Sequence, residues 1–309
     1  MSWLVWCGLG PLLLAAALAP FFREALRPKL SDKERQGASG QFAQLQDGLT
    51  YFEWRGPAQG HVIVLVHGLT TPSFVWLSIA EALAADGYRV LRYDLFGRGL
   101  SDRPKGLQDR DFFVGQLTEL LAREGVGQDI TIIGYSMGGA IATAFASMHP
   151  ARVRQLVLIA PAGMQKLSGG LVRLVRVLPG VGDWLMHTAY PGILRRGLDA
   201  ERDLETSVPG INDLQRAELT RRGFLPAVLS SLRGILATRL STDHRLIAKW
   251  EIPVLAIWGS DDDVISLNAK DQLAEWNHEA DQVVVPNAGH GLPYTHTDEV
   301  LAHIRKWLI

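Results

Sequence analysis

A strand, a sharp turn and a helix follow one another within residues 129–149, DITIIGYSMGGAIATAFASMH. The Ile-rich run before the turn predicts a buried strand, and the Ala-rich stretch after it predicts a buried helix. The turn reads G-Y-S-M-G, and in this context the serine is held in a strained backbone conformation with its hydroxyl exposed. Ser136 is therefore a candidate nucleophile. The N–H of Met137 begins the helix, where a backbone donor can stabilise a negatively charged oxygen.

Apolar strand-like runs alternate with helical stretches on either side of this turn. A hairpin is expected at residues 42–55, with Asp47 and Gly48 in its tight turn. Continuous apolar runs are typical of strands buried on both faces, so the alternation predicts an α/β fold with a mostly parallel sheet. The 309 residues are enough for a large core. The expected strands are 61–66, 88–93, 129–133, 154–160, 253–258 and 282–285, with helices at 76–86 and 109–124.

Composition excludes several classes of protein. The net charge is −1 and no basic stripe is interleaved with aromatic residues, so the chain gives no indication of nucleic-acid binding. The single cysteine, Cys7, excludes an intrachain disulfide and a multi-cysteine metal site. No feature of the sequence predicts an oligomeric state.

Residues 1–22 form a hydrophobic segment without a charged side chain. A run of about 20 apolar residues is long enough to cross a bilayer as a helix. Its tryptophans and phenylalanines lie towards the two ends, as in an aromatic belt. The positive region that begins a signal peptide is missing, although residues 17–19, Ala-Leu-Ala, resemble a cleavage site. We therefore predict an uncleaved membrane anchor. The alternatives are a cleaved signal peptide and a helix that docks on the domain or lies in one leaflet.

Lys and Arg flank this segment only on its C-terminal side, at positions 23, 27, 29, 33 and 35. Positively charged flanks stay in the cytoplasm, so the main domain is expected on the cytoplasmic side of the membrane. Signal cleavage would make the domain secreted or periplasmic instead. Residues 23–41 are mostly polar and predict a linker.

About 90 residues between the strands at 154–160 and 253–258 have helical character and little strand signal. We predict a helical cap at 164–250, inserted into a core made of residues 42–163 and 251–309. The cap segment has 13 Lys and Arg against 8 Asp and Glu, so it is basic although the whole chain is not. A basic, leucine-rich surface of this kind suggests contact with an anionic membrane. Solvated arginines on an ordinary cap are the alternative.

Three motifs occur in an order that resembles the α/β-hydrolase superfamily. They are H-G-L-T at 67–70, D-L-F-G-R-G-L-S-D-R-P at 94–104 and G-Y-S-M-G-G at 134–139. The resemblance covers about residues 42–309 and depends on the order and spacing of several motifs. It implies the α/β-hydrolase fold, with the cap over the active site, and a reaction that requires no metal or cofactor.

The resemblance also implies a nucleophile, an acid and a base in that order along the chain. The strand at 253–258 leads into three consecutive acids, Asp261, Asp262 and Asp263. One of them is well placed on the loop after the strand. The family's G-x-x-D spacing favours Asp262, and the other two acids remain as alternatives.

His290 follows the last expected strand within P-N-A-G-H-G, which resembles the family's terminal loop. The implied catalytic triad is Ser136, Asp262 and His290. The implied oxyanion hole consists of the backbone N–H groups of Leu69 and Met137.

These residues predict acyl transfer by a serine hydrolase. The anchor, the S-M-G-G motif and the P-A-G turn at 161–163 resemble monoacylglycerol lipases and membrane-anchored carboxylesterases, so the expected substrate is an ester or lipid with a medium or long acyl chain. Alternatives with the same triad are a C–C bond hydrolase of dienone acids, a small-molecule carboxylesterase and a cofactor-free perhydrolase or haloperoxidase. A non-catalytic ligand-binding protein is the alternative from another class. Haloalkane dehalogenases and the usual epoxide hydrolases are disfavoured, because they carry Asp in place of Ser136.

Overall fold

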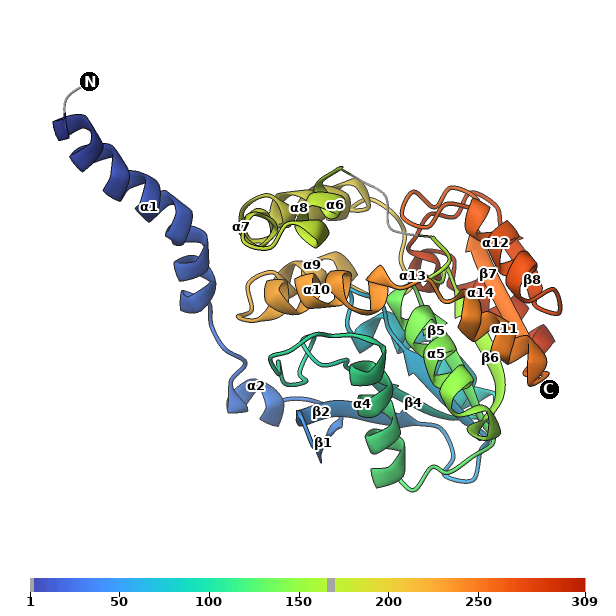
Figure 1. Cartoon of the computed structure of the whole chain (residues 1–309). Coiled ribbons are helices and arrows are strands. Elements are labelled where there is room, and N and C mark those ends of the chain that lie inside the picture. Colours follow the sequence, from blue (N-terminus) through green and yellow to red (C-terminus); the bar gives the residue numbers. More distant parts are fainter. Residues whose placement is uncertain (1–2, 166–169, 309) are drawn as a thin grey trace.

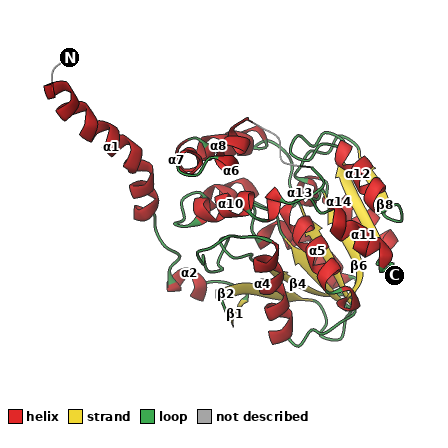
Figure 2. Cartoon of the chain, viewed as in Figure 1, coloured by secondary structure: helices red, strands yellow, loops and turns green. Residues whose placement is uncertain are grey.

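The protein is a central sheet covered by helices on both faces, with a long N-terminal helix that projects away from the body (Figures 1 and 2). The computed structural model describes residues 3–165 and 170–308, so small parts of the predicted anchor and cap lie outside the described residues. The described strands form an 8-stranded sheet in the order β1-β2-β4-β3-β5-β6-β7-β8. They are β1 (Gln41–Leu45), β2 (Gly48–Arg55), β3 (Val62–Val66), β4 (Arg89–Tyr93), β5 (Ile130–Tyr135), β6 (Val153–Ile159), β7 (Val254–Gly259) and β8 (Asp281–Val285).

The pairing of these strands confirms the predicted mostly parallel α/β sheet. β2 runs antiparallel to both β1 and β4, and the other neighbours pair in parallel. The chain adds β4 on one side of β3 and β5 on the other, so the sheet reverses its direction of growth at β3. Val66 lies opposite Gly134, and the loops after β3 and β5 therefore leave the sheet side by side. Ligands of open α/β sheets bind at such a point.

Alternate residues of each strand join opposite halves of the core, because successive side chains of a strand point to opposite faces. In β5, Ile132 packs on one side and Ile133 on the other, and both are fully buried. This arrangement explains why the central strands are continuous apolar runs. The helices that cover the first side include α4 (Arg110–Arg123) and α5 (Met137–Met148), and those on the second side include α3 (Leu77–Ala85) and α14 (Thr297–Trp307).

The segment between β6 and β7 contains helices and no strand among its described residues. Five of these helices form a layer beyond one end of the sheet, while α11 packs beside α5 and α12 (Figure 1). The helices are α6 (Gly170–Val177), α7 (Val181–Thr188), α8 (Tyr190–Ala200), α9 (Ile211–Glu218), α10 (Phe224–Arg233) and α11 (Ser241–Lys249), followed by α12 (Asn268–Trp276) after β7. We refer to α6 to α10 as the cap.

A buried carboxylate joins the cap to the core. Glu218, at the end of α9, is 3% exposed and accepts a hydrogen bond from the N–H of Gly99 at 3.0 Å. It also lies 3.1 Å from the guanidinium of Arg221 and 3.6 Å from that of Arg103. Burial raises the pKa of Glu218 from 4.5 to about 7, although both arginines lower it.

The N-terminal helix α1 (Trp3–Leu26) continues beyond the predicted anchor into the predicted linker. Its last turn is held by Glu24, whose Oε1 accepts a hydrogen bond from the N–H of Gly223 in the cap at 2.6 Å. A second short helix, α2 (Asp32–Gln36), begins at a capping box between Ser31 and Glu34. The predicted linker at 23–41 is therefore partly helical, and its first residues belong to α1.

No helix in the part of the chain that the structure describes combines the length and apolar character needed to cross a membrane. The membrane anchor at residues 1–22 stays a prediction, and residues 1 and 2 lie outside the described residues.

Removal of a central core side chain should destabilise the sheet in proportion to the cavity left behind. Ile132→Ala is expected to cost about 2–5 kcal/mol and Ile132→Val about 0.5–1.5 kcal/mol, since Ile132 is fully buried. Chemical denaturation of the full chain measures both values. Equal stabilities of the two variants would contradict this packing.

Glu218→Gln should change how stability depends on pH. Between pH 4.5 and 7 the folded state keeps a proton that the unfolded state releases, so this contribution is complete below pH 4.5 and is lost as pH rises through 7. Glutamine retains an acceptor for Gly99 and does not titrate. We expect the free energy of unfolding of the variant to gain on that of the parent from pH 5 to pH 8, by on the order of 1–3 kcal/mol, as measured by chemical denaturation at each pH. The exposed Asp213→Asn on the same helix is the control, and a pH-independent difference for Glu218→Gln would contradict the prediction.

Candidate active site

Ser136 lies between β5 and α5 in a conformation that side chains rarely adopt, with φ 53° and ψ −118°. Backbone strain of this kind costs about 1–3 kcal/mol and persists only where the surroundings impose it. The N–H of Ser136 donates to the carbonyl of Ile159 at 3.0 Å, and its own carbonyl accepts from the N–H of Ala162 at 3.0 Å. These bonds to β6 and to the loop after it hold the strained residue in place.

Glycines at positions 134 and 138 allow this turn to form. A Cβ atom at Gly138 would lie 2.0 Å from the carbonyl oxygen of Val66, and one at Gly134 would lie 2.4 Å from that of Gly138. The helix α5 therefore begins in backbone contact with β3. This close approach brings Ser136 to the switch point of the sheet.

Three predicted side chains form a line of hydrogen bonds. Nε2 of His290 lies 3.0 Å from Oγ of Ser136, and Nδ1 of His290 lies 2.8 Å from Oδ2 of Asp262. Because a carboxylate only accepts, Nδ1 carries the proton and Nε2 is left to accept from the serine hydroxyl. The side chain of Asp262 is 2% exposed and that of His290 is 16% exposed. The acid is thus shielded from water while the base reaches the surface of the site.

The three consecutive acids occupy different environments. Oδ1 of Asp262 accepts hydrogen bonds from the N–H groups of Val264 at 2.9 Å and Ile265 at 2.8 Å, which turn its carboxylate inwards. Asp261 and Asp263 are exposed. The structure therefore brings Asp262, and neither of its neighbours, to His290.

The two predicted oxyanion donors lie on the adjacent loops that follow β3 and β5. Met137 is the first residue of α5, so its N–H has no acceptor within the helix. A Cβ atom built on Gly68 would lie 3.4 Å from Cβ of Ser136, which places the chain before Leu69 against the serine. Neither the N–H of Leu69 nor that of Met137 donates to another described residue. Both donors are therefore free to bind a developing negative charge.

A buried arginine supports the loop that contains Leu69. Nε of Arg98 donates to the carbonyl of Leu69 at 3.0 Å, and its two terminal nitrogens reach the carbonyl of Phe96 at 2.9 Å and Oγ of Ser231 at 2.8 Å. Arg98 is fully buried, which lowers its pKa to about 9 and leaves it charged at neutral pH. It joins this loop to α10 of the cap. The sequence analysis used residues 94–104 only as a motif and assigned no role to Arg98, although a single arginine between two glycines was its visible signal.

Two further buried side chains hold the loops around the triad. Nε2 of His67 accepts from the N–H of Leu95 at 2.9 Å, so Nδ1 carries the proton and donates to the carbonyl of Gly68 at 2.8 Å. Burial lowers the pKa of His67 to about 4, and the ring stays neutral. The hydroxyl of Tyr135 donates to the carbonyl of His290 at 3.0 Å. Both residues act on the backbone and not on the reacting atoms.

This geometry can perform nucleophilic acyl transfer. An activated hydroxyl, a base held by a buried acid and two free backbone donors are the groups that such a reaction uses. Among the described residues, no group of three or more His, Cys, Asp and Glu side chains is arranged to hold a metal ion. The fold and the site together define a hydrolase.

The chain belongs to the alpha/beta hydrolase fold family, whose model matches residues 61–297. The expected α/β-hydrolase fold is therefore confirmed, and the matched range contains all the predicted site residues.

The relatives at low identity include esterases, lipases and other hydrolases. Lipase 3 of Moraxella sp. is 26% identical over 237 residues, which cover 75% of this chain and 72% of the relative. A 2-hydroxy-6-oxononadienedioate/2-hydroxy-6-oxononatrienedioate hydrolase of Cupriavidus pinatubonensis is 28% identical over 276 residues, which cover 84% of this chain and 92% of the relative. The crystal structure of a membrane phospholipase A superposes with a TM-score of 0.71 at 23% identity and covers 98% of this chain and 97% of its own. The lipase relative supports an ester hydrolase in general, and the phospholipase A structure shows the shared fold alone.

Substitution within the acidic loop should separate Asp262 from its neighbours. We expect Asp262→Asn to lower kcat by about 10²- to 10⁴-fold, because the amide no longer holds the protonated Nδ1 of His290. Asp263→Asn, one residue away and exposed, should keep its activity within about threefold of the parent. Steady-state hydrolysis of a p-nitrophenyl ester measures both, and equal losses would contradict the assignment of the acid.

Proposed function

We propose that the protein is a serine esterase that hydrolyses carboxylic esters of lipids, in particular monoacylglycerol-like esters. The observation that carries the proposal is the hydrogen-bonded line from Ser136 through His290 to Asp262, beside two free N–H donors. The same line suits other acyl esters, so the substrate class depends on further features of the chain.

In the proposed mechanism, Oγ of Ser136 attacks the ester carbonyl carbon while its proton passes to Nε2 of His290. Asp262 stabilises the resulting imidazolium, and the N–H groups of Leu69 and Met137 stabilise the negative oxygen. The ester C–O bond then breaks, and His290 returns the proton to the leaving alcohol. Water attacks the acyl-enzyme by the same steps, which releases the fatty acid and restores the Ser136 hydroxyl.

The lipid substrate is supported by the apolar surface of α1. Leu13, Leu14, Phe22 and Leu26 each expose more than 60% of their surface. Large exposed apolar side chains in a row mark a site of membrane or protein contact. Lipase 3 of Moraxella sp. is named for activity on lipids and is similar over most of the chain, which favours the same substrate class.

We further propose that α1 attaches the enzyme to a membrane without crossing it, with the apolar side chains in one leaflet. Five Lys and Arg follow this segment between positions 23 and 35, and the anionic lipids of the cytoplasmic leaflet attract such basic residues, which favours the cytoplasmic face. A secreted or periplasmic enzyme after signal cleavage is the alternative. Intact mass of the membrane-bound protein distinguishes them, because cleavage would remove about 20 residues.

A C–C bond hydrolase is the second candidate. It is favoured by the relative in Cupriavidus pinatubonensis, which is named as a hydrolase of dienedioates. Such a substrate carries carboxylates, and arginines of the cap could bind them. A small-molecule carboxylesterase uses the same residues. A non-catalytic ligand-binding protein would have no need for a strained serine beside free donors.

Ser136→Ala should lower ester hydrolysis by about 10⁴- to 10⁶-fold, because the nucleophile is removed. We would assay the parent and the variant on glyceryl and p-nitrophenyl esters of increasing chain length, with dienone acids as the comparison. Preference for medium or long monoacylglycerols supports the lipid esterase. Activity confined to short esters, or to dienone acids, would contradict it.

Labelling by a fluorophosphonate tests the serine independently of the substrate. The parent and Ser241→Ala, which lies far along the chain in α11, should label equally, and Ser136→Ala should not label. An unlabelled parent would favour the non-catalytic protein.

A further inference from the structure

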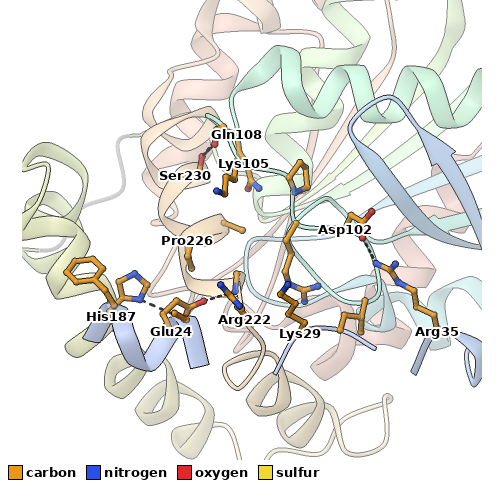
Figure 3. A pocket seen from close by; sticks show the side chains of 18 residues that line it. Glu24, Lys29, Arg35, Asp102, Lys105, Gln108, His187, Arg222, Pro226 and Ser230 are labelled. Atoms are coloured by element: carbon orange, nitrogen blue, oxygen red, sulfur yellow. Dashed lines mark hydrogen bonds and ion pairs between the residues drawn. The ribbon is translucent and has the colours of Figure 1, made fainter. Parts of the chain in front are cut away.

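A large pocket lies away from Ser136, His290 and Asp262. It is formed by the end of α1, the loop 99–108 and the start of α10 (Figure 3). Its volume is about 1080 Å³, and none of the five predicted site residues lines it. Sites for small molecules occupy roughly 300–1,000 Å³, so this pocket can hold a sizeable group.

The lining of the pocket is strongly basic in a protein of net charge −1. It contains five Lys and Arg side chains and two carboxylates. These side chains are Lys29, Arg35, Arg103, Lys105, Arg222, Glu24 and Asp102.

Both carboxylates already have partners. Asp102 pairs with Arg35 at 2.5 Å and accepts from the N–H of Leu49 at 2.8 Å. Glu24 pairs with Arg27 at 2.8 Å and accepts from the N–H of Gly223. Neither acid is therefore available to neutralise the remaining cations.

Three of the cations have no such partner. Lys29, Lys105 and Arg222 are exposed, and their side chains form no ion pair or hydrogen bond with the residues that the structure describes. They come from three separate segments and surround one pocket (Figure 3). Like charges repel, so three unpaired cations at one place favour an anionic ligand.

The pocket and the apolar surface of α1 involve the same helix. Phe21 lines the pocket, and its ring lies against His187 of the cap with 5.3 Å between centroids. A groove lined by Leu14, Leu18 and Phe22 runs along the preceding turns of the same helix. A ligand with an anionic head and apolar chains matches both surfaces at once.

We infer that this pocket binds the phosphate headgroup of an anionic phospholipid whose acyl chains contact the apolar side chains of α1. The inference rests on the proposed membrane attachment of α1 and goes beyond it, because it names the lipid class and the residues. Each Lys or Arg near an anionic surface contributes about fivefold to binding, so three give on the order of 100-fold.

The test is flotation of the full chain with vesicles, in a Ser136→Ala background so that no lipid is hydrolysed. Vesicles of phosphatidylcholine are compared with vesicles that contain about one third phosphatidylglycerol. We expect stronger binding to the anionic vesicles by about 10- to 100-fold, and loss of this preference in Lys29→Ala/Lys105→Ala/Arg222→Ala. High salt should also reduce the preference, because exposed charges are screened.

The matched control is Arg245→Ala/Lys249→Ala/Lys306→Ala, which removes the same charge from exposed positions on α11 and α14, on the far side of the molecule from α1 (Figure 1). It should keep the preference, and unchanged melting temperatures show that both triple variants fold. If the pocket variant kept its preference for anionic vesicles, or if the control variant lost it equally, the proposed headgroup site would be contradicted.

Two other outcomes separate this inference from the membrane proposal. Equal binding to neutral and anionic vesicles would contradict the headgroup site and leave the attachment of α1 intact. No binding to either kind of vesicle would contradict the headgroup site and the attachment of α1. Binding of glycerol phosphate by the full chain in the absence of vesicles, together with equal binding to neutral and anionic vesicles, would show that the pocket takes a soluble phosphate ester, and it would overturn the lipid assignment.

Discussion

The close contact between α5 and β3 is the constraint on which the candidate site depends. Only a glycine at 138 lets the helix begin against the carbonyl of Val66, and the strained residue Ser136 directly precedes this helix. The N–H of Met137, the first residue of this helix, has no acceptor among the described residues. Nucleophile and oxyanion donors are thus set by one backbone approach, and their geometry does not depend on flexible side chains.

The base and the acid reach this point because parallel strands end at a common edge. β7 and β8 lie on the same side of β5 in the sheet, and the loops after them carry Asp262 and His290 to Ser136. Two buried charged side chains connect the cap to the loops around the site. Arg98 and Glu218 connect α10 and α9 with the loops after β3 and β4, so the position of the cap and the shape of the candidate oxyanion hole share the same supports.

Much of the fold followed from local patterns, because a strand buried on both faces must be apolar whatever its neighbours are. The hairpin at 42–55 and the parallel strands lie within a residue or two of their predicted positions. The N-terminal helix extends further along the chain than its apolar sequence predicts. Hydropathy is a property of the segment alone, whereas the docking of Glu24 on Gly223 extended α1 into the predicted linker. Arg98 was missed for the same reason, since its partners come from distant positions.

The sequence by itself determined the α/β class, the turn at Ser136 and the candidate base, because strand periodicity, glycine placement and motif order are all local or sequential properties. Only the tertiary structure decided among Asp261, Asp262 and Asp263, since the choice depends on which carboxylate two backbone N–H groups turn towards His290. It alone also assembled the basic pocket, whose cations are separated by up to about 190 residues and meet only when α1 docks on the cap.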